Sequence, residues 1–348
     1  MAVVSYLFGG PIADKFPPQK LIASALFLTA LGGFVLGTYP SYTTLLLLYG
    51  YWGFTTIFLF WAPLIKATRL WGGTLHQGKA FGFLDGGRGL VAASFGLIGV
   101  AVFSFFLPEN QTSFVINVQQ DAFQKVIWLA SLLIILVAVL VLFFLQFQNK
   151  EANVNVQRIT RSLVGEVLKL PSVWWLMLII LCAYFGYKTT DMFSLYARDV
   201  MKLNEVKAAG VGTSMLYVRP IIGVCVGLLA DRSKPSFWLQ IGFCLTIVSA
   251  GIFALGLLSH TSFLAFIIGT LCVAIGVYTT RVLYFALLEE SNIPLVWSGT
   301  AIGLISVVGY TPDIFAGPLM GYFLDTFTGK LGHQYVFLCL VGFSFIGF

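Results

Sequence analysis

Nine long apolar segments constrain this chain more than any other feature of its sequence. A window of about 19 residues places them at 21–38, 43–65, 80–107, 125–146, 172–196, 207–229, 236–258, 263–288 and 298–323. A helix rises 1.5 Å per residue, and about 20 apolar residues are needed to cross a hydrocarbon core roughly 30 Å thick. The segments therefore predict an all-α integral membrane protein that crosses the bilayer many times.

The composition excludes several other classes of protein. Hydrophobic residues make up 58% of the chain and charged residues only 10%, too few to cover the surface of a soluble protein of this length. We therefore interpret the net charge of +6 as membrane topology and expect no nucleic-acid partner. The five cysteines stand singly in apolar segments, and no hydrolase or phosphate-binding motif occurs. We expect neither an enzyme nor a bound metal or cofactor.

The distribution of basic residues predicts the orientation in the membrane. If the loop that contains Asp14 is cytoplasmic, eleven Lys and Arg residues lie inside and five outside. This orientation predicts a multi-pass protein of the plasma (inner) membrane with a cytoplasmic central loop. Residues 1–12 and 335–348 are apolar but too short to span the bilayer, so we expect the chain to be truncated at both ends.

A short pattern occurs twice, each time between two apolar segments. The copies read GPIADK and GLLADR, and their aspartates are 231 − 14 = 217 residues apart. This spacing predicts two related halves: an N-terminal bundle over 1–146, a linker over 147–171 and a C-terminal bundle over 172–348. An apolar stripe in the linker suggests a short surface helix there. The residues of the repeated pattern are Gly10, Asp14, Lys15, Gly227, Asp231 and Arg232.

The repeated pattern resembles the loop motif G-x-L-A-D-R-x-G-R-K of the major facilitator superfamily. The resemblance implies two pseudo-symmetric six-helix bundles, with the first span missing here and the second and last spans partial. The first copy departs from the motif at Pro17 and Pro18. In this family the motif forms a charged latch that holds one conformation, which implies that role for Asp14 and Asp231 with a neighbouring cation. A simple helix cap is the alternative.

Seven charged residues lie inside the apolar segments. Each costs at least about 2.5 to 3.5 kcal/mol at the middle of a membrane, so each must face a partner or a polar pathway. Two pairs, Asp85 with Arg88 and Lys188 with Asp191, are spaced i, i+3 and can neutralise each other within one helix. Arg219 and Arg281 have no carboxylate within a turn, so they must pair across the bundle or with a substrate. The seventh is Asp313.

These charges predict a binding site for an anion. Four cations outnumber three carboxylates, and arginine grips a carboxylate or phosphate through two parallel hydrogen bonds. Asp313 follows Pro312 and is a candidate for proton coupling or gating, or else for a packing ion pair with Lys188 or Arg281; Asp191 and Asp85 are further candidates. The predicted substrate-binding residues are Arg88, Lys188, Arg219, Arg281, Tyr217 and Tyr284.

A second resemblance is to the sugar-phosphate permease branch of the superfamily. It rests on the stretches His76-Gln77-Gly78-Lys79 and Asp85-Gly86-Gly87-Arg88-Gly89, and on Asp191 followed by Tyr196-Ala197-Arg198-Asp199-Val200. It implies an organic anion or a sugar phosphate as substrate.

Together the patterns predict a secondary active transporter of a small anionic solute. It would work by alternating access within the lipid bilayer, as a monomer, with protons or an exchanged anion as the drive. The alternative is a permease-like membrane sensor that binds an anionic ligand without transporting it.

Overall fold

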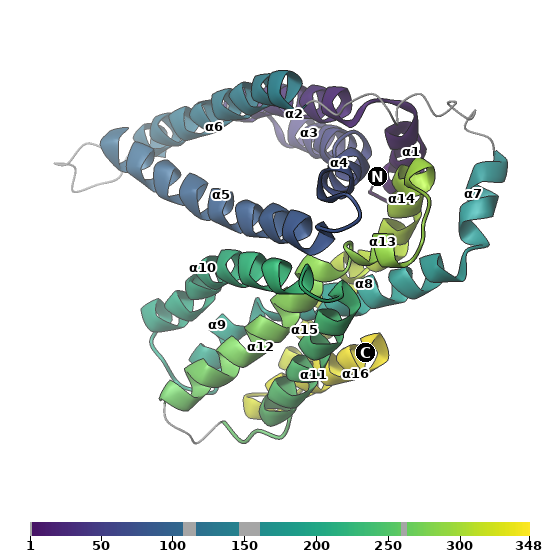
Figure 1. Ribbon diagram of the computed structural model, residues 1–348. Helices are drawn as coiled ribbons and strands as arrows, with labels where there is room; N and C mark the ends of the chain where they lie inside the picture. Colours follow the sequence, from purple (N-terminus) through teal and green to yellow (C-terminus); the bar gives the residue numbers. More distant parts are fainter. Residues whose placement is uncertain (1, 107–115, 146–160, 259–262) are drawn as a thin grey trace. The chain divides into compact units, whose positions relative to one another are not determined.

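The structure, a computed structural model, describes residues 2–106, 116–145, 161–258 and 263–348, and these residues form helices without any strand (Figure 1). The α-helices are α1 (Ala2–Lys15), α2 (Pro18–Leu36), α3 (Tyr42–Gly53), α4 (Trp61–Gly72), α5 (Gln77–Phe106), α6 (Ile116–Phe144), α7 (Arg161–Leu168), α8 (Pro171–Thr189), α9 (Met192–Asp199), α10 (Glu205–Ala230), α11 (Pro235–Ala254), α12 (Phe263–Leu283), α13 (Leu287–Glu290), α14 (Ser298–Gly309), α15 (Pro312–Thr326) and α16 (Lys330–Gly347). A π-helical turn, η1 (Phe54–Phe58), joins α3 to α4, and a 3-10 turn, η2 (Leu295–Trp297), precedes α14.

Within the described residues, nine helical segments are long and apolar enough to cross a membrane. They coincide with the nine predicted segments and confirm the all-α membrane fold. The helix bounds differ from the prediction at several ends. The fifth helix, for example, begins at Gln77, and the segment predicted to end at residue 65 continues to Gly72.

Two of the interrupted predicted spans carry Lys188 and Asp313. The span over 172–196 divides between α8 and α9 at Thr190 and Asp191, where the Thr190 hydroxyl donates 2.7 Å to the Tyr187 carbonyl. The span over 298–323 divides between α14 and α15. Pro312 is the first residue of α15, where its missing N–H costs nothing and its fixed φ suits a helix start. Pro312 therefore begins a helix and does not kink one.

The chain forms two compact units that are discontinuous in sequence. The first comprises residues 1–70, 91–167 and 294–304, and the second comprises 71–90, 168–293 and 305–348. Helices α5 and α14 thus contribute residues to both units. The division into bundles over 1–146 and 172–348 stays a prediction. In the linker, α7 is helical from Arg161, and residues 146–160, including Arg158 and Ile159 of the predicted surface helix, lie outside the described residues.

Glycines let helix backbones touch in each unit. In the second unit, a Cβ at Gly78 would lie 2.6 Å from the Gly227 carbonyl oxygen, and one at Gly82 would lie 2.6 Å from that of Gly223. In the first unit, a Cβ at Gly10 would lie 2.5 Å from the carbonyl oxygen of Gly299. Small residues at such crossings allow the close packing that drives helix association in lipid. The start of α5 is thereby held against the end of α10.

The core of the second unit is aromatic. Five fully buried rings pack against one another from α9, α11, α12 and α16. This packing holds α12, which carries Arg281, against α9 and α11. The rings are Phe193, Tyr196, Phe253, Phe266 and Phe337.

Candidate functional site

An ion pair in the second unit joins α5 to α10. The Arg219 guanidinium donates to both carboxylate oxygens of Asp85, with Nε 3.0 Å from Oδ2 and Nη2 2.5 Å from Oδ1. This bidentate geometry is the strongest that the two groups can form. Asp85 is buried and therefore pairs across helices. Arg88, the predicted partner within α5, is exposed one turn further along, and the hydrogen bonds to the Asp85 carboxylate come from Arg219.

Arg281 on α12 lies beside this pair but is incompletely bonded. Its side chain is buried, with 8% of the residue exposed, and its Nε is 3.6 Å from Asp85 Oδ1. That distance is an ion-pair contact but too long for a hydrogen bond. Arg281 Nε and Nη1 are buried and have no hydrogen-bond partner in the part of the chain that the structure describes. A buried cation thus keeps two unused donors.

Aromatic rings hold the two guanidinium groups. The Tyr187 ring centroid is 3.6 Å from Cζ of Arg281 and 5.2 Å from Cζ of Arg219, whose Nη1 also donates 3.2 Å to the Tyr187 hydroxyl. The Tyr184 ring lies 5.4 Å from the Arg281 guanidinium. Such contacts are stabilising, more so when the cation is desolvated. Tyr187 therefore fixes the plane of Arg281 and leaves the edges of the guanidinium as its donors.

Two further tyrosines complete the cluster, and one predicted tyrosine lies apart from it. The hydroxyls of Tyr284 and Tyr310 are 3.0 Å apart, and both residues are buried. The rings of Tyr310 and Tyr184 form a T-shaped contact with 4.6 Å between their centroids. Tyr217, predicted near Arg219, is 49% exposed on α10, and the ring that contacts Arg219 is that of Tyr187.

A second ion pair lies where the two broken helices meet. Lys188 Nζ at the end of α8 is 3.0 Å from Asp313 Oδ1 at the start of α15. The Tyr184 hydroxyl donates to the same carboxylate at 3.1 and 3.2 Å. The structure thus contains the ion pair that was one of the two alternatives for Asp313. Asp191, the other predicted partner of Lys188, is exposed in the turn between α8 and α9.

We define the central cluster by the residues that these contacts connect. It gathers α5, α8, α10, α12 and α15 within the second unit, together with the turns that follow α12 and α14. Tyr184, Tyr187 and Tyr310 were not among the predicted site residues. The signal that could have identified the first two is their three-residue spacing on the span that carries Lys188. The central cluster comprises Asp85, Tyr184, Tyr187, Lys188, Arg219, Arg281, Tyr284, Tyr310 and Asp313.

The aspartates of the repeated pattern cap helix starts. In the first unit, Asp14 accepts hydrogen bonds from the backbone N–H groups of Gly299 and Thr300, each at 2.7 Å, and from the Thr300 hydroxyl. These groups open α14, where a carboxylate satisfies free N–H groups and the helix dipole. Lys66 Nζ lies 3.0 Å from Asp14. The neighbouring cation is thus Lys66, while Lys15 is exposed.

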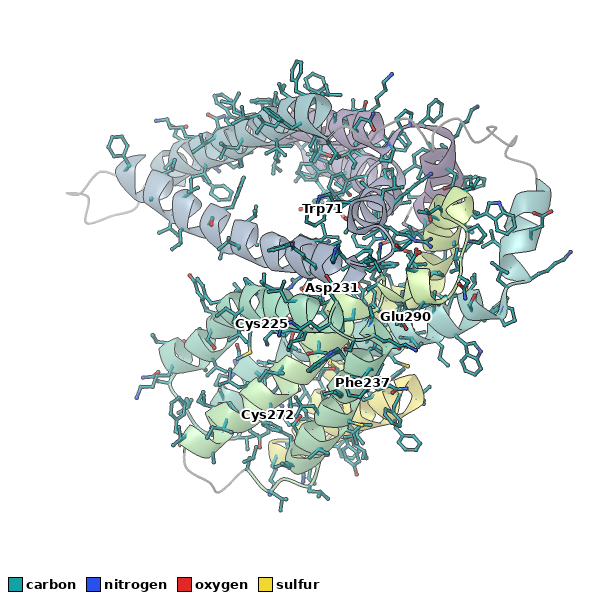
Figure 2. All side chains as sticks on the ribbon, viewed as in Figure 1. Trp71, Cys225, Asp231, Phe237, Cys272 and Glu290 are labelled. Carbon is teal, nitrogen blue, oxygen red and sulfur yellow. The ribbon has the colours of Figure 1, made fainter. Side chains whose placement is uncertain are left out.

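The second copy repeats this arrangement at the start of α5. Asp231, labelled in Figure 2, accepts a 3.1 Å hydrogen bond from the backbone N–H of Lys79, and its other oxygen is 3.5 Å from Nδ1 of His76. Arg232 is exposed. Gly227 lies within the close crossing with Gly78. In both copies the aspartate therefore caps the start of a helix from another part of the chain, and the latch stays a prediction.

The cysteines are free and dispersed. Figure 2 shows Cys225 on α10 and Cys272 on α12, and all five are single thiols. Among the described residues, no group of three His, Cys, Asp or Glu side chains is placed to hold a metal ion.

Comparisons with known proteins agree with this architecture. The chain is 29% identical over 351 residues to the inner membrane protein YqcE of Escherichia coli K12, covering 97% of this chain and 79% of that one. It is 27% identical over 354 residues to the inner membrane protein YihN of the same organism, covering 100% and 82%. Its fold is similar to that of the E. coli fucose:proton symporter FucP, with a TM-score of 0.74, 16% identity and coverage of 99% and 87%.

The family model of the Major Facilitator Superfamily matches residues 1–310. This match confirms the predicted superfamily, whose members are transporters that bind small molecules in a lipid bilayer and are not enzymes. The chain belongs to the Major Facilitator Superfamily and is a multi-pass membrane transporter.

Proposed function

We propose that this protein is a secondary active transporter that moves a small anionic solute across the inner membrane by alternating access. The observation that carries this proposal is Arg281, a buried arginine with two unpaired donors beside a stacked tyrosine. The inner membrane is supported by the two curated relatives, both named inner membrane proteins. A cytoplasmic central loop and a monomeric state stay predictions of the same proposal.

Arg281 suits the recognition of an anion because its hydrogen-bonding capacity is unused. A buried donor without an acceptor costs about 1–3 kcal/mol, and more when it is charged. A carboxylate, sulfonate or phosphate oxygen supplies the missing acceptor. Tyr187 holds the guanidinium plane by stacking, so the donors are oriented before the solute arrives. Arg281 is therefore the proposed primary contact with the solute.

The other predicted binding residues take supporting roles in this proposal. Arg219 is engaged bidentately by Asp85, so it fixes the carboxylate that faces Arg281. Lys188 and the more exposed Arg88 add positive potential near the site. Tyr284 closes the cluster through its contact with Tyr310. An organic anion or a sugar phosphate is the substrate class that the resemblance to the sugar-phosphate permease branch supports.

Asp313 is the proposed coupling residue. Its carboxylate pairs with Lys188 at a break in α8–α9 and in α14–α15. Protonation would remove the charge of Asp313 and release Lys188, which would loosen both helix breaks at once. Asp85, held by Arg219, and Asp191, in the turn after α8, are the remaining candidates for proton coupling. The capped aspartates Asp14 and Asp231 are proposed to stabilise one conformation of the cycle.

The proposal is tested by ligand-induced thermal stabilisation followed by uptake into proteoliposomes. Purified protein is screened with carboxylates, sulfonates, sugar phosphates, phosphate and nitrate, because a ligand that binds only the folded state raises its stability. Arg281→Gln should abolish the stabilisation and the uptake. The matched control is Lys207→Gln, which removes an exposed cation at the start of α10 and should change neither.

The same experiment distinguishes the alternatives. If correctly inserted Arg281→Gln protein moves the solute as well as the parent, the proposed site is wrong. If the parent binds an anion but proteoliposomes show no uptake, the sensor alternative holds instead. Stabilisation by cationic or neutral compounds alone would mean that the charges of the central cluster serve only as internal ion pairs.

A further inference from the structure

The charges of the central cluster leave a single positive charge without a partner of its own. Arg219 is neutralised by Asp85 through two hydrogen bonds, and Lys188 by Asp313 at 3.0 Å. Arg281 remains, 3.6 Å from a carboxylate that Arg219 already engages. Three cations and two carboxylates therefore sum to one positive charge.

The charges near the cluster but outside it do not alter this sum. Arg88 and Asp191 each lie three residues from a charged member of the cluster, and both are exposed. They are opposite in sign, and exposed charges are screened more strongly than buried ones. The uncompensated charge is thus that of Arg281.

Because the cluster is buried, its net charge affects which ligand charge it can bind. Asp85 is 6% exposed and Arg281 is 8% exposed, so uncompensated charge at this point is expensive. One negative charge on the ligand completes a neutral cluster. A second negative charge on the same group would face Asp85, whose carboxylate already lies on the Nε side of Arg281. The cluster thus favours one negative charge and opposes two.

We infer that the solute presents a singly charged oxyanion, a carboxylate or a sulfonate, to Arg281, and that a doubly charged phosphate ester is disfavoured at neutral pH. This inference rests on the proposed function, because it concerns the charge of the solute held at that site. It departs from the sugar-phosphate class that the sequence resemblance implies.

The test uses pairs of probes that share a skeleton and differ in charge. The pairs are glucuronate with glucose 6-phosphate, and benzoate with phenyl phosphate. A phosphate ester has a second pKa of about 6, so it is mainly a dianion at about pH 7.5 and mainly a monoanion at about pH 5. Binding of each probe to the purified full-length protein is measured by thermal stabilisation at both pH values.

We expect the carboxylates to bind at both pH values and the phosphate esters to bind at least about tenfold more weakly at high pH than at low pH. Phosphate binding that is equal or stronger at high pH, and lost in Arg281→Gln, would overturn the inference while the anion site stands. Stabilisation by these anions that is unchanged in Arg281→Gln would overturn the proposed function itself.

A charge variant gives an independent test. Asp313→Asn raises the sum of the central cluster from +1 to +2, so it should shift preference toward the dianionic phosphate esters at high pH. Asp325→Asn is the matched control, because Asp325 lies on the same helix, is exposed and is not part of the central cluster. An unchanged preference in Asp313→Asn protein that still binds the carboxylates would overturn the inference.

Discussion

Tyr187 shows how one side chain can prepare a cation for binding. Its ring stacks on Arg281 and its hydroxyl accepts from Arg219, so it touches both arginines of the central cluster. The stacking keeps the Arg281 plane fixed without using any of its N–H donors. A hydrogen-bonding residue in the same place would fix Arg281 by consuming the donors that the solute needs.

Substitutions at Tyr187 separate these two contacts. Tyr187→Ala removes the stacking, worth up to about 2 kcal/mol for a desolvated cation, and should weaken anion binding roughly tenfold or more. Tyr187→Phe keeps the ring and should weaken it only a few-fold. Titration of thermal stabilisation with the strongest ligand measures both. Tyr217→Ala, at an exposed tyrosine of α10, is the control; equal losses at both positions would contradict the role of Tyr187.

Asp85 is the residue on which the stability of the cluster depends most. Asp85→Asn leaves the Arg219 and Arg281 charges without their shared carboxylate, and breaking a buried pair costs about 3–5 kcal/mol. We expect a clearly lowered melting temperature in detergent. The double variant Asp85→Asn with Arg219→Gln should recover part of the loss, because it removes one of the two stranded charges. A single variant as stable as the parent would show that water already compensates these arginines.

The sequence predicted part of this residue pattern correctly. Arg219 and Arg281 have no carboxylate within a helical turn, and this alone showed that their partners lie on other helices or on a solute. The spacing of Asp85 with Arg88 and of Lys188 with Asp191 could indicate only contacts within one helix, whereas the ion pairs of Asp85 and Lys188 in the structure join different helices. Asp85 pairs with Arg219, which is 134 residues further along the chain, and its spacing in the sequence gave no sign of this contact. Lys188 pairs with Asp313, 125 residues further along, and this ion pair was one of the alternatives for Asp313.

At the scale of the helices, α5 and α10 approach closely because both have glycine where their backbones cross. Gly227 lies so close to α5 that a Cβ would sit 2.5 Å from the Gly78 carbonyl oxygen and 2.9 Å from the Gly82 Cα. The obstacles are backbone atoms, which cannot rotate away. The two helices must therefore separate if this position gains even one methyl group.

Gly227→Ala should accordingly destabilise the protein by about 1–3 kcal/mol, the usual cost of overpacking. The matched control is Gly87→Ala, also in a helix at this crossing, where a Cβ would meet nothing within 4 Å. Melting temperatures of both purified variants in the same detergent provide the comparison. If Gly227→Ala protein has the same melting temperature as the parent, the two backbones do not approach this closely.

The helices themselves were largely predictable, whereas the break between α8 and α9 was not. The nine spans follow from apolar length, which the bilayer enforces. The break at Thr190 occurs in sequence with no proline or glycine at that point, where a side-chain hydrogen bond to the Tyr187 carbonyl competes with the helix. The second break did carry a signal, since Pro312 is well suited to the first position of a helix.

At the scale of the whole molecule, the family was predictable from the repeated pattern. The 217-residue spacing of Asp14 and Asp231 indicated two related halves, and the superfamily match over residues 1–310 confirms the assignment. What the pattern did not reveal is that both aspartates bind helix starts far away in sequence, Asp14 at α14 and Asp231 at α5. The repeated pattern showed where the two loops lie in the sequence. Which helix start each aspartate binds depends on the three-dimensional fold.

Coupling of solute movement to a proton gradient is a property of the whole transport cycle. We expect a substitution of Asp313 to abolish this coupling. Asp313→Asn cannot exchange a proton, so proteoliposomes should lose uptake driven by a proton gradient while they keep exchange of labelled for unlabelled solute. Asp325→Asn, at an exposed position of the same helix, should keep both activities. Gradient-driven uptake that survives in Asp313→Asn would assign the coupling to another carboxylate or to anion exchange.

The cap that Asp14 provides for α14 also sets an order of events during biosynthesis. Its hydrogen-bond donor Gly299 is 285 residues further along the chain, which a ribosome working at about 5–20 residues per second reaches roughly 15 to 60 s later. Lys66, only 52 residues away, emerges first and can shield the carboxylate during that interval. A nascent chain arrested between these two points would expose an unfinished first unit to the proteases that monitor membrane insertion.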